Sequence, residues 1–371
     1  MASVEEKENN MDSTAPPPST TSTHHQLKPS FLVIFNATLM LLGCGGPLLL
    51  RLYFVRGGHR MWLSAFLQVC AWPILLLPLS ISHLFLPATA AAATRRRCRR
   101  FFLLLPPALT AACAVLGLLI AVDSYMYSYA SSFLPLSTSS LLMASQLAFT
   151  AVFALLIVRQ RFTPFSLNAV VLLTLGPVVL GLGGASDRPE GEPQSKYYLG
   201  FCMMVAAAAL IGLVLPLVEL AYRRTTEEMT YAMVIETQMV MGASGSLFCL
   251  LGMLLSKDFQ AIPKEAREFE LGELRYYMVL IWDAICWQIL NVGLVGVIFS
   301  ASSLFGGMMI AILVPIGEIL PVIFLNEKFN GSKAVALALS LWGFASYLYG
   351  ELKQGKKSKQ TTEVELPLPV P

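Results

Sequence analysis

The stretch YYLGFCMMVAAAALIGLVLPLVELA, residues 197–221, decides the fold class because it is long, apolar and almost uncharged. Its one charged side chain is Glu219, close to its end. A helix needs about 20 largely apolar residues to cross the hydrocarbon core of a bilayer. The stretch therefore predicts a membrane-spanning helix.

Further runs of the same kind lie on both sides of this stretch. They are centred on residues 30–51, 62–86, 101–130, 135–158 and 165–184 before it, and on 230–255, 275–299, 302–325 and 332–350 after it. Strands of a membrane barrel alternate apolar and polar residues over about ten positions, whereas these runs are apolar throughout. The sequence predicts an all-α, polytopic membrane protein with ten transmembrane helices.

The composition agrees with that fold class. Of the 371 residues, 56% are hydrophobic and 13% are charged, and the mean hydropathy is +0.65. A soluble domain carries about 25% charged residues, so an ordinary soluble enzyme, a disordered scaffold and a nucleic-acid binder are excluded. No HExxH, GxSxG or P-loop motif occurs, and we therefore expect neither an enzyme nor a cofactor.

A polar segment divides the chain into two halves of five helices each. We expect a disordered cytoplasmic tail over 1–29, a first repeat over 30–184, a linker over 185–196, a second repeat over 197–350 and a disordered cytoplasmic tail over 351–371. The fourth and ninth runs share Ser-Ser-Leu near their starts, at 139–141 and 302–304. Because each half has an odd number of helices, the halves would be inverted relative to each other, as in many secondary transporters.

The orientation follows from the distribution of Lys and Arg, which favour cytoplasmic loops. The densest cluster is the arginine-rich loop 95–100, which lies between the second and third runs. Placing that loop in the cytoplasm puts both termini there as well.

The charges inside the runs are acidic rather than basic. Every Lys and Arg lies in a loop, in a tail or at the end of a run, although Arg51 and Arg223 could reach inward. A phosphorylated substrate would need buried cations, so this distribution argues against one. The acidic residues inside the runs are Asp123, Glu219, Glu236, Asp283 and Glu318.

A carboxylate inside the membrane is costly and indicates function by default. For proton coupling we put Glu236 and Glu318 first, and Asp283 and Asp123 next. Glu219 is close to Arg223 and Arg224 in the sequence, so we expect it to pair with one of them. Structural hydrogen bonding is the alternative role for all of these acids.

Two stripes of side chains predict a site for a planar heteroaromatic ligand. Asp283, Trp287 and Asn291 are spaced i, i+4 and i+8 and share one helical face. An aromatic ring can stack on a base, and an amide can read its donor and acceptor edge. The second stripe is Ser139, Met143, Gln146 and Thr150, and further candidate side chains are Gln288, Gln238 and Trp72. Hydrogen bonding between helices is the competing explanation.

Several strings resemble those of the plant purine permeases. Together they cover nearly all of residues 30–351, and they include Trp62-Leu63-Ser64, Trp72-Pro73, Leu134-Pro135-Leu136-Ser137-Thr138-Ser139-Ser140, Glu236-Thr237-Gln238, Trp287-Gln288 and Leu339-Ser340-Leu341-Trp342-Gly343. The resemblance implies the drug/metabolite transporter fold, with ten helices in an inverted repeat of five plus five. It also implies proton symport of purine nucleobases and derivatives such as adenine and cytokinins.

From these observations we expect a secondary active transporter whose partners are a purine-type substrate, protons and the lipid bilayer, with no nucleic acid. The ligand would stack on Trp287 and be held at its edge by Asn291, Gln288 or Gln146. Other planar heterocycles, such as alkaloids or vitamins, and a membrane receptor that does not transport its ligand are the alternatives. The plasma membrane is the expected location, with the endoplasmic reticulum and the vacuole as alternatives.

Overall fold

The computed structural model describes residues 29–84, 105–159, 164–182, 194–225, 229–310 and 331–364, together with Leu313 and Ile323. Every regular element within these ranges is helical. The first half contains α1 (Pro29–Gly43), α2 (Gly46–Val55), α3 (Met61–Cys70), η1 (Trp72–Leu75), α4 (Leu76–Leu84), α6 (Pro107–Phe133), α7 (Leu136–Ala144), α8 (Gln146–Phe153), η2 (Ala154–Val158) and α9 (Pro164–Leu182). The second half contains α10 (Gln194–Arg224), α11 (Tyr231–Leu255), α12 (Asp258–Glu268), α13 (Glu273–Ser300) and α15 (Gly331–Val364).

Seven helical segments of the described chain are long and apolar enough to cross a membrane. They are Phe31–Val55, Met61–Ser80, Pro107–Phe133, Thr138–Val158, Gln194–Arg224, Tyr231–Leu255 and Glu273–Ser300. The expected run 165–184 coincides with α9, and 332–350 lies within α15, which continues to Val364. Most of the expected run 302–325 lies outside the described residues. An all-helical fold is therefore confirmed, and the count of ten spans stays a prediction.

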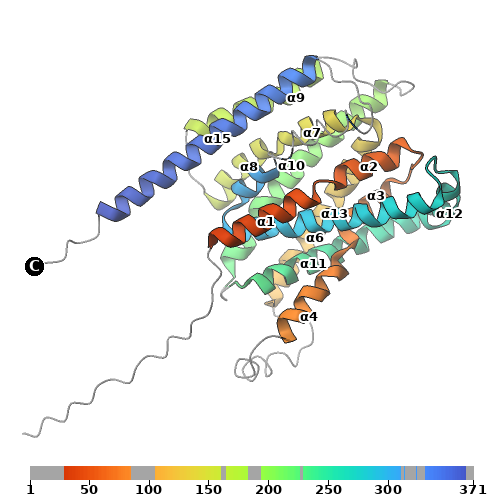
Figure 1. Cartoon of the computed structure of the whole chain (residues 1–371), viewed down its shortest axis with the longest axis horizontal. Coiled ribbons are helices and arrows are strands. Elements are labelled where there is room, and N and C mark those ends of the chain that lie inside the picture. The colour runs from red at the N-terminus through yellow and green to blue at the C-terminus, as the bar shows by residue number, and fades with distance from the viewer. Residues whose placement is uncertain are drawn as a thin grey trace, which may run out of the picture.

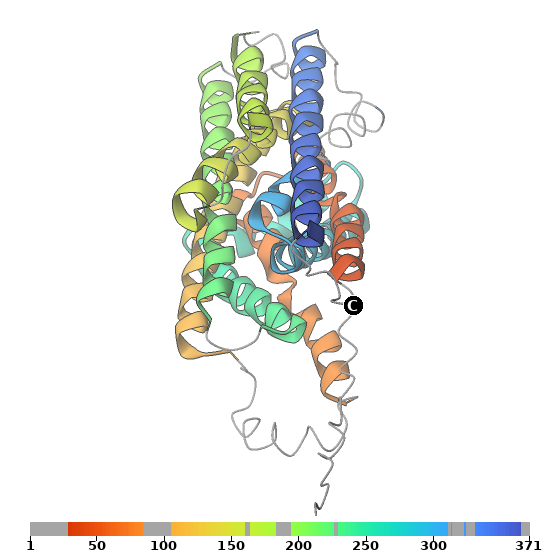
Figure 2. The ribbon, with the colours of Figure 1, turned by 90° about the vertical axis from the view of Figure 1, so that its left-hand side faces the viewer.

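The helices form one elongated bundle (Figure 1). Helices α9 and α15 pack side by side at one edge of the bundle. Helix α4 lies at the opposite edge, as both views show (Figures 1 and 2). The described part of the central bundle consists of α1, α2, α3, α6, α7, α8, α10, α11 and α13, and the longest of these helices pack against one another directly.

Glycines allow some of these helices to approach backbone to backbone. A Cβ atom on Gly43 of α1 would lie 2.5 Å from the backbone nitrogen of Leu290 and 2.6 Å from the carbonyl oxygen of Cys286, both on α13. Further along the same contact, a Cβ on Gly293 would lie 2.7 Å from the carbonyl oxygen of Asn36. Small residues at such contacts are typical of membrane helix packing, where close van der Waals contact provides much of the association energy.

Three of the spans are interrupted part-way along their length. Gly45 separates α1 from α2, which has Pro47 in its first turn, and Trp72-Pro73 begins the short η1 helix after α3. Proline cannot donate a backbone hydrogen bond, so it favours such breaks. Ser145 separates α7 from α8, and its hydroxyl donates to the carbonyl oxygen of Leu142 at 2.6 Å. Back-bonding of this kind bends helices.

A buried polar cluster closes one end of the bundle, where α12 packs against the loop between α2 and α3. Its centre is the carboxylate of Glu265 in α12, which is only 6% exposed. That carboxylate accepts hydrogen bonds from the hydroxyls of Tyr53 at 2.5 Å and Tyr276 at 3.0 Å, and from the backbone N–H of His59 at 3.2 Å. Arg60 adds an ion pair at 3.5 Å. The cluster joins the first half of the chain, through Tyr53, His59 and Arg60, to the second half.

Candidate binding cavity

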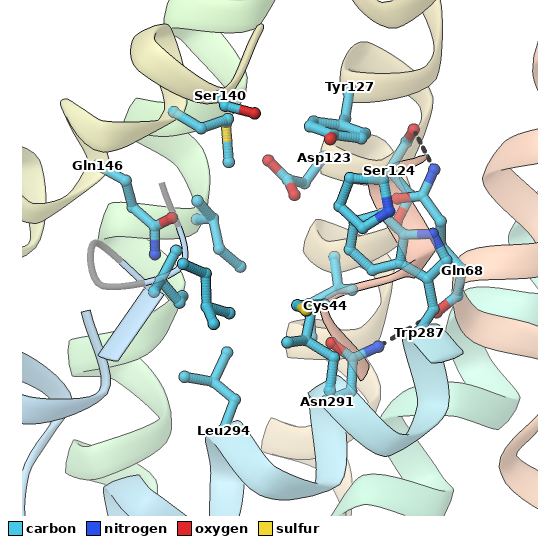
Figure 3. A pocket seen from close by; sticks show the side chains of 17 residues that line it. Cys44, Gln68, Asp123, Ser124, Tyr127, Ser140, Gln146, Trp287, Asn291 and Leu294 are labelled. Carbon is cyan, nitrogen blue, oxygen red and sulfur yellow. Dashed lines mark hydrogen bonds between the residues drawn. The ribbon is translucent and has the colours of Figure 1, made fainter. Parts of the chain in front are cut away.

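A cavity with a volume of about 150 Å³ lies among the central helices. Its wall includes both apolar side chains and a set of polar or aromatic ones (Figure 3), namely Cys44, Gln68, Asp123, Ser124, Tyr127, Ser140, Gln146, Trp287 and Asn291. None of the described residues that line it is a lysine, arginine or histidine. A volume of this size is comparable to cavities that accept a benzene ring, so a small flat molecule is the natural type of occupant.

Two of the helix interruptions meet at this cavity. Cys44 and Pro47, at the break between α1 and α2, line it on one side. Gln146, the first residue of α8 after the break at Ser145, lines it on another. Many transporters build their substrate sites from discontinuous helices near the middle of the membrane, because a break frees polar groups to face a ligand.

Trp287 of α13 provides the main aromatic surface. Its indole packs edge-on against the ring of Tyr127, with centroids 5.6 Å apart and planes at 79°. Gly46 packs closely against the indole, because a Cβ atom there would lie 3.0–3.2 Å from Nε1, Cε2 and Cδ1 of the ring. These two contacts fix the indole, and its remaining surface helps to line the cavity.

A hydrogen-bonded network orients the amides beside Trp287. The side-chain amide of Asn291 donates to the backbone carbonyl of Gln68 at 3.1 Å, and the side-chain amide of Gln68 donates to the hydroxyl of Ser128 at 2.8 Å (Figure 3 shows the first of these contacts). Gln68 also reaches the carbonyl of Ser124 at 3.4 Å. This contact uses one of the two N–H groups of the Asn291 amide, so its carbonyl oxygen and its other N–H are left to serve a ligand.

Asp123 and Gln146 face each other across the cavity (Figure 3). One carboxylate oxygen of Asp123, both amide atoms of Gln146 and the indole nitrogen of Trp287 are buried without a hydrogen-bond partner in the described part of the chain. Buried polar atoms are almost always satisfied, and an exception needs an explanation. A ligand that offers a matching donor and acceptor edge would satisfy Asp123 and Gln146, whereas the indole N–H of Trp287 faces Asp283, outside the cavity wall.

Four of the site residues predicted from the sequence line this cavity: Trp287, Asn291, Gln146 and Asp123. Each of the two predicted stripes lies only partly along the cavity. In the fourth span, Met143 and Gln146 line the cavity, whereas Ser139 and Thr150 are buried away from it and Ser140 takes their place. The break at Ser145 interrupts the regular spacing on which that stripe depended.

On α13, Asp283 and Gln288 lie outside the cavity wall. Asp283 is 1% exposed, and the indole N–H of Trp287 faces its carboxylate from one turn further along. The two groups fall short of hydrogen-bonding geometry. Gln288 is 3% exposed and its amide atoms have no partner among the described residues.

The remaining predicted residues lie elsewhere or outside the described chain. Trp72 packs on Gly242 of α11 and does not line the cavity. Gln238, also on α11, lines a smaller neighbouring cavity. Glu236 is buried, at 3% exposure, but lines neither cavity. Glu318 lies outside the described residues.

The charged residues at the span ends make local contacts. Glu219 forms an ion pair with Arg223 at 2.5 Å, as expected, and also accepts a hydrogen bond from the backbone N–H of Ser303 at 2.7 Å. Arg51 is buried and donates to the backbone carbonyl of Ser131 at 2.7 Å, near the end of α6. Arg51 therefore binds the C-terminal carbonyls of a helix, where a cation is favourable.

Gln68, Tyr127 and Ser140 are cavity residues that we missed in the sequence. Two signals were present. Gln68 is an amide within an apolar run, one helical turn before Trp72. Tyr127 follows Asp123 at i+4, so the pair has the same spacing as Asp283 and Trp287. That spacing placed Asp123 on a face with an aromatic ring.

Comparison with known proteins identifies the class to which this fold and cavity belong. Residues 31–357 match a family model described as purine nucleobase transmembrane transport. The chain is 45% identical to Purine permease 3 of Arabidopsis thaliana over 335 residues, which cover 90% of this chain and 94% of that protein. It is 48% identical to Purine permease 2 of Arabidopsis thaliana over 351 residues, which cover 91% of this chain and 97% of that protein.

The chain belongs to the purine permease family. Its relatives are membrane transporters, not enzymes. These matches confirm the resemblance noted in the sequence. They also confirm the predictions of a multi-pass membrane protein and of a small purine-type substrate.

Proposed function

We propose that this protein is a proton-coupled importer of purine nucleobases and their derivatives, of which adenine and cytokinins are the first candidates. One observation carries the proposal. The cavity combines a fixed indole with buried polar atoms of Asp123 and Gln146 that have no partner in the described chain. A purine has an aromatic face that can stack on the indole and an edge of alternating donors and acceptors that can satisfy those atoms.

The geometry of the cavity leads us to rank the candidate proton-coupling residues differently from the ranking by sequence. Asp123 is the one carboxylate among the described residues that lines the cavity, so we place it ahead of Glu236, Glu318 and Asp283. With no cation in the described wall, an ionised Asp123 is costly in a membrane interior. Binding a proton there removes that cost, and this links proton binding to purine binding at the same side chain.

Alternating access would move the two halves of the chain against each other as an inverted repeat. A second sequence match supports this arrangement, because Pro47-Leu48 and Tyr53 recur at the same spacing as Pro216-Leu217 and Tyr222. Pro47 and Ile211, from the two matched helices, both line the cavity. We keep both termini in the cytoplasm and the plasma membrane as the location.

The test of coupling is labelled adenine uptake into yeast that lacks its own purine uptake, with and without an uncoupler. Wild-type protein should accumulate adenine, and the uncoupler should abolish accumulation. Asp123→Asn should retain exchange of labelled for unlabelled adenine but lose uphill accumulation. If the Asp123→Asn protein still concentrates adenine in an uncoupler-sensitive way, Asp123 is not the coupling residue. Accumulation by wild type that ignores the uncoupler would indicate a facilitator instead.

The test of the purine position uses Trp287→Ala with Trp287→Phe as its matched control. Stacking contributes about 1–3 kcal/mol per base, so the alanine variant should weaken adenine affinity by roughly 5- to 150-fold. Phenylalanine keeps an aromatic face and should lose much less. Equal affinity for adenine in the wild-type and alanine proteins would remove Trp287 from the site.

A further inference from the structure

A second, smaller cavity adjoins the first. Its volume is about 40 Å³, and it shares Ile120, Ile211, Leu294 and Asn291 with the wall of the larger cavity. Asn291 and Leu294 lie together at one end of the larger cavity, as Figure 3 shows. The shared residues come from α6, α10 and α13, so the two spaces meet between these three helices. We refer to the smaller one as the side chamber.

The side chamber differs from the main cavity in its chemistry. The described residues that belong to it alone are chiefly aliphatic, and they include Val214, Val218, Met241, Val295 and Ile298. The amides of Gln238 and Asn291 are the polar side chains in the described part of its wall. A buried water needs two to four polar partners, so most of this space is unsuited to water and suited to methyl and methylene groups.

The size of the side chamber limits what can enter it. One water-sized group needs about 10–15 Å³ of cavity volume measured in this way, so 40 Å³ accommodates about three such groups. A purine ring system is too large for it, but a chain of about three carbon atoms is not. An aliphatic chain attached to a ring in the main cavity would reach it past Leu294 and Asn291.

We propose that the side chamber is a binding subsite for a short aliphatic substituent carried by the purine ring. The proposal rests on the proposed function, since it requires a purine in the main cavity. The main cavity then recognises the ring through stacking and polar contacts, and the side chamber selects among purines by the length of the attached chain. Val218 and Met241, on α10 and α11, set the capacity of the side chamber from two sides.

The experiment measures how well a series of alkylated adenines competes with labelled adenine for uptake. The series runs from methyl to butyl on the exocyclic amine, with a second series on N9. Burial of one methylene contributes about 0.8 kcal/mol, so affinity in one of the two series should rise roughly fourfold per carbon. The rise should stop after about three carbons, when the side chamber is full.

Two variants change the capacity of the side chamber in opposite directions. Val218→Leu fills it and should shorten the optimal chain by about one carbon, whereas Met241→Ala enlarges it and should lengthen the optimum. Adenine itself does not reach the side chamber, so its own affinity should stay within about twofold of wild type. The control is Val152→Leu, because Val152 lies on α8 at 43% exposure and lines neither cavity.

The outcomes separate this proposal from the proposed function. If both variants transport adenine normally but keep the wild-type dependence on chain length, the side chamber is not the subsite and the proposal is overturned. A flat dependence in wild type for both series overturns it as well. Failure of wild-type protein to take up adenine at all would instead contradict the proposed function. If Val218→Leu does not fold, the shift expected for Met241→Ala decides the question alone.

Discussion

Replacement of Glu265 by alanine should destabilise the protein more than any other single change at the α12 end of the bundle. The Glu265 carboxylate is 6% exposed. It accepts hydrogen bonds from Tyr53, Tyr276 and the backbone of His59, and it pairs with Arg60. Alanine would leave two buried tyrosine hydroxyls without this acceptor, and it would separate α12 from the loop between α2 and α3.

The expected magnitude follows from these contacts. A hydrogen bond to a charged group contributes about 1.5–3 kcal/mol, but three bonds to one carboxylate are not independent. Removing one partner of a buried charged network costs about 3–5 kcal/mol, and we expect a loss of unfolding free energy in that range. Glu268 provides a matched control on the same helix, since its side chain is 68% exposed and it reaches Lys264 only at 3.9 Å. Exposed pairs of this kind contribute about 0–1 kcal/mol.

The assay is chemical unfolding of the purified protein in detergent, followed by tryptophan fluorescence, for Glu265→Ala, Glu268→Ala and wild type. Glu265→Gln adds a second comparison, because it keeps the shape and one acceptor oxygen but removes the charge. It should fall between wild type and Glu265→Ala. Equal losses in Glu265→Ala and Glu268→Ala would refute the reasoning that the buried network joins the two halves of the chain at this end.

Three further changes test the cavity and the packing around it. Adenine should slow the alkylation of Cys44 in the cavity wall severalfold and leave that of the exposed Cys202 unchanged, as measured by mass spectrometry of the labelled peptides. Gly43→Ala should cost about 1–3 kcal/mol, because its Cβ meets the backbone of α13, whereas Gly331→Ala, with open space around it, should change unfolding by less than about 0.5 kcal/mol. Arg51→Ala, which removes the cation from the end of α6, should cost about 1.5–3 kcal/mol in the same unfolding assay, more than the removal of the exposed Arg56.

The spans themselves could be predicted closely because the bilayer imposes a simple rule. The run predicted at 230–255 is α11, Tyr231–Leu255, and the run at 275–299 is α13, Glu273–Ser300. A helix forms all of its backbone hydrogen bonds within one segment, as the hydrocarbon core requires, and about 20 apolar residues are enough for it to cross that core. Length and composition therefore locate a span without any knowledge of its neighbours.

The direction in which each polar residue faces could not be predicted in the same way. Asp123 and Asp283 are both acids in long apolar helices, yet Asp123 lines the cavity and Asp283 lies behind Trp287. That difference depends on how α6 and α13 are rotated against their neighbours. Close glycine contacts constrain this rotation, at Gly117 for α6 and at Gly43 and Gly293 for α13, and they are tertiary contacts without a periodic signal. The helix breaks at Gly45 and Ser145 were not predicted either, because each lies inside a run that is apolar on both sides of the break.

The composition of the cavity wall explains why ligand and proton would share one residue under the proposed mechanism. Asn291 offers its carbonyl oxygen and the N–H that Gln68 does not engage, and Asp123 adds a carboxylate. The described wall contains no cation that would hold Asp123 in its ionised form. A protonated Asp123 can donate its O–H to a ring nitrogen of the purine, so proton binding and purine binding favour each other, and linkage requires that each raises the affinity for the other by the same factor. A tenfold change corresponds to about 1.4 kcal/mol, which is at the upper end of the range of about 0.5–1.5 kcal/mol that one hydrogen bond contributes. Coupling of useful size thus needs no separate proton site, only a carboxylate that contacts the ligand directly.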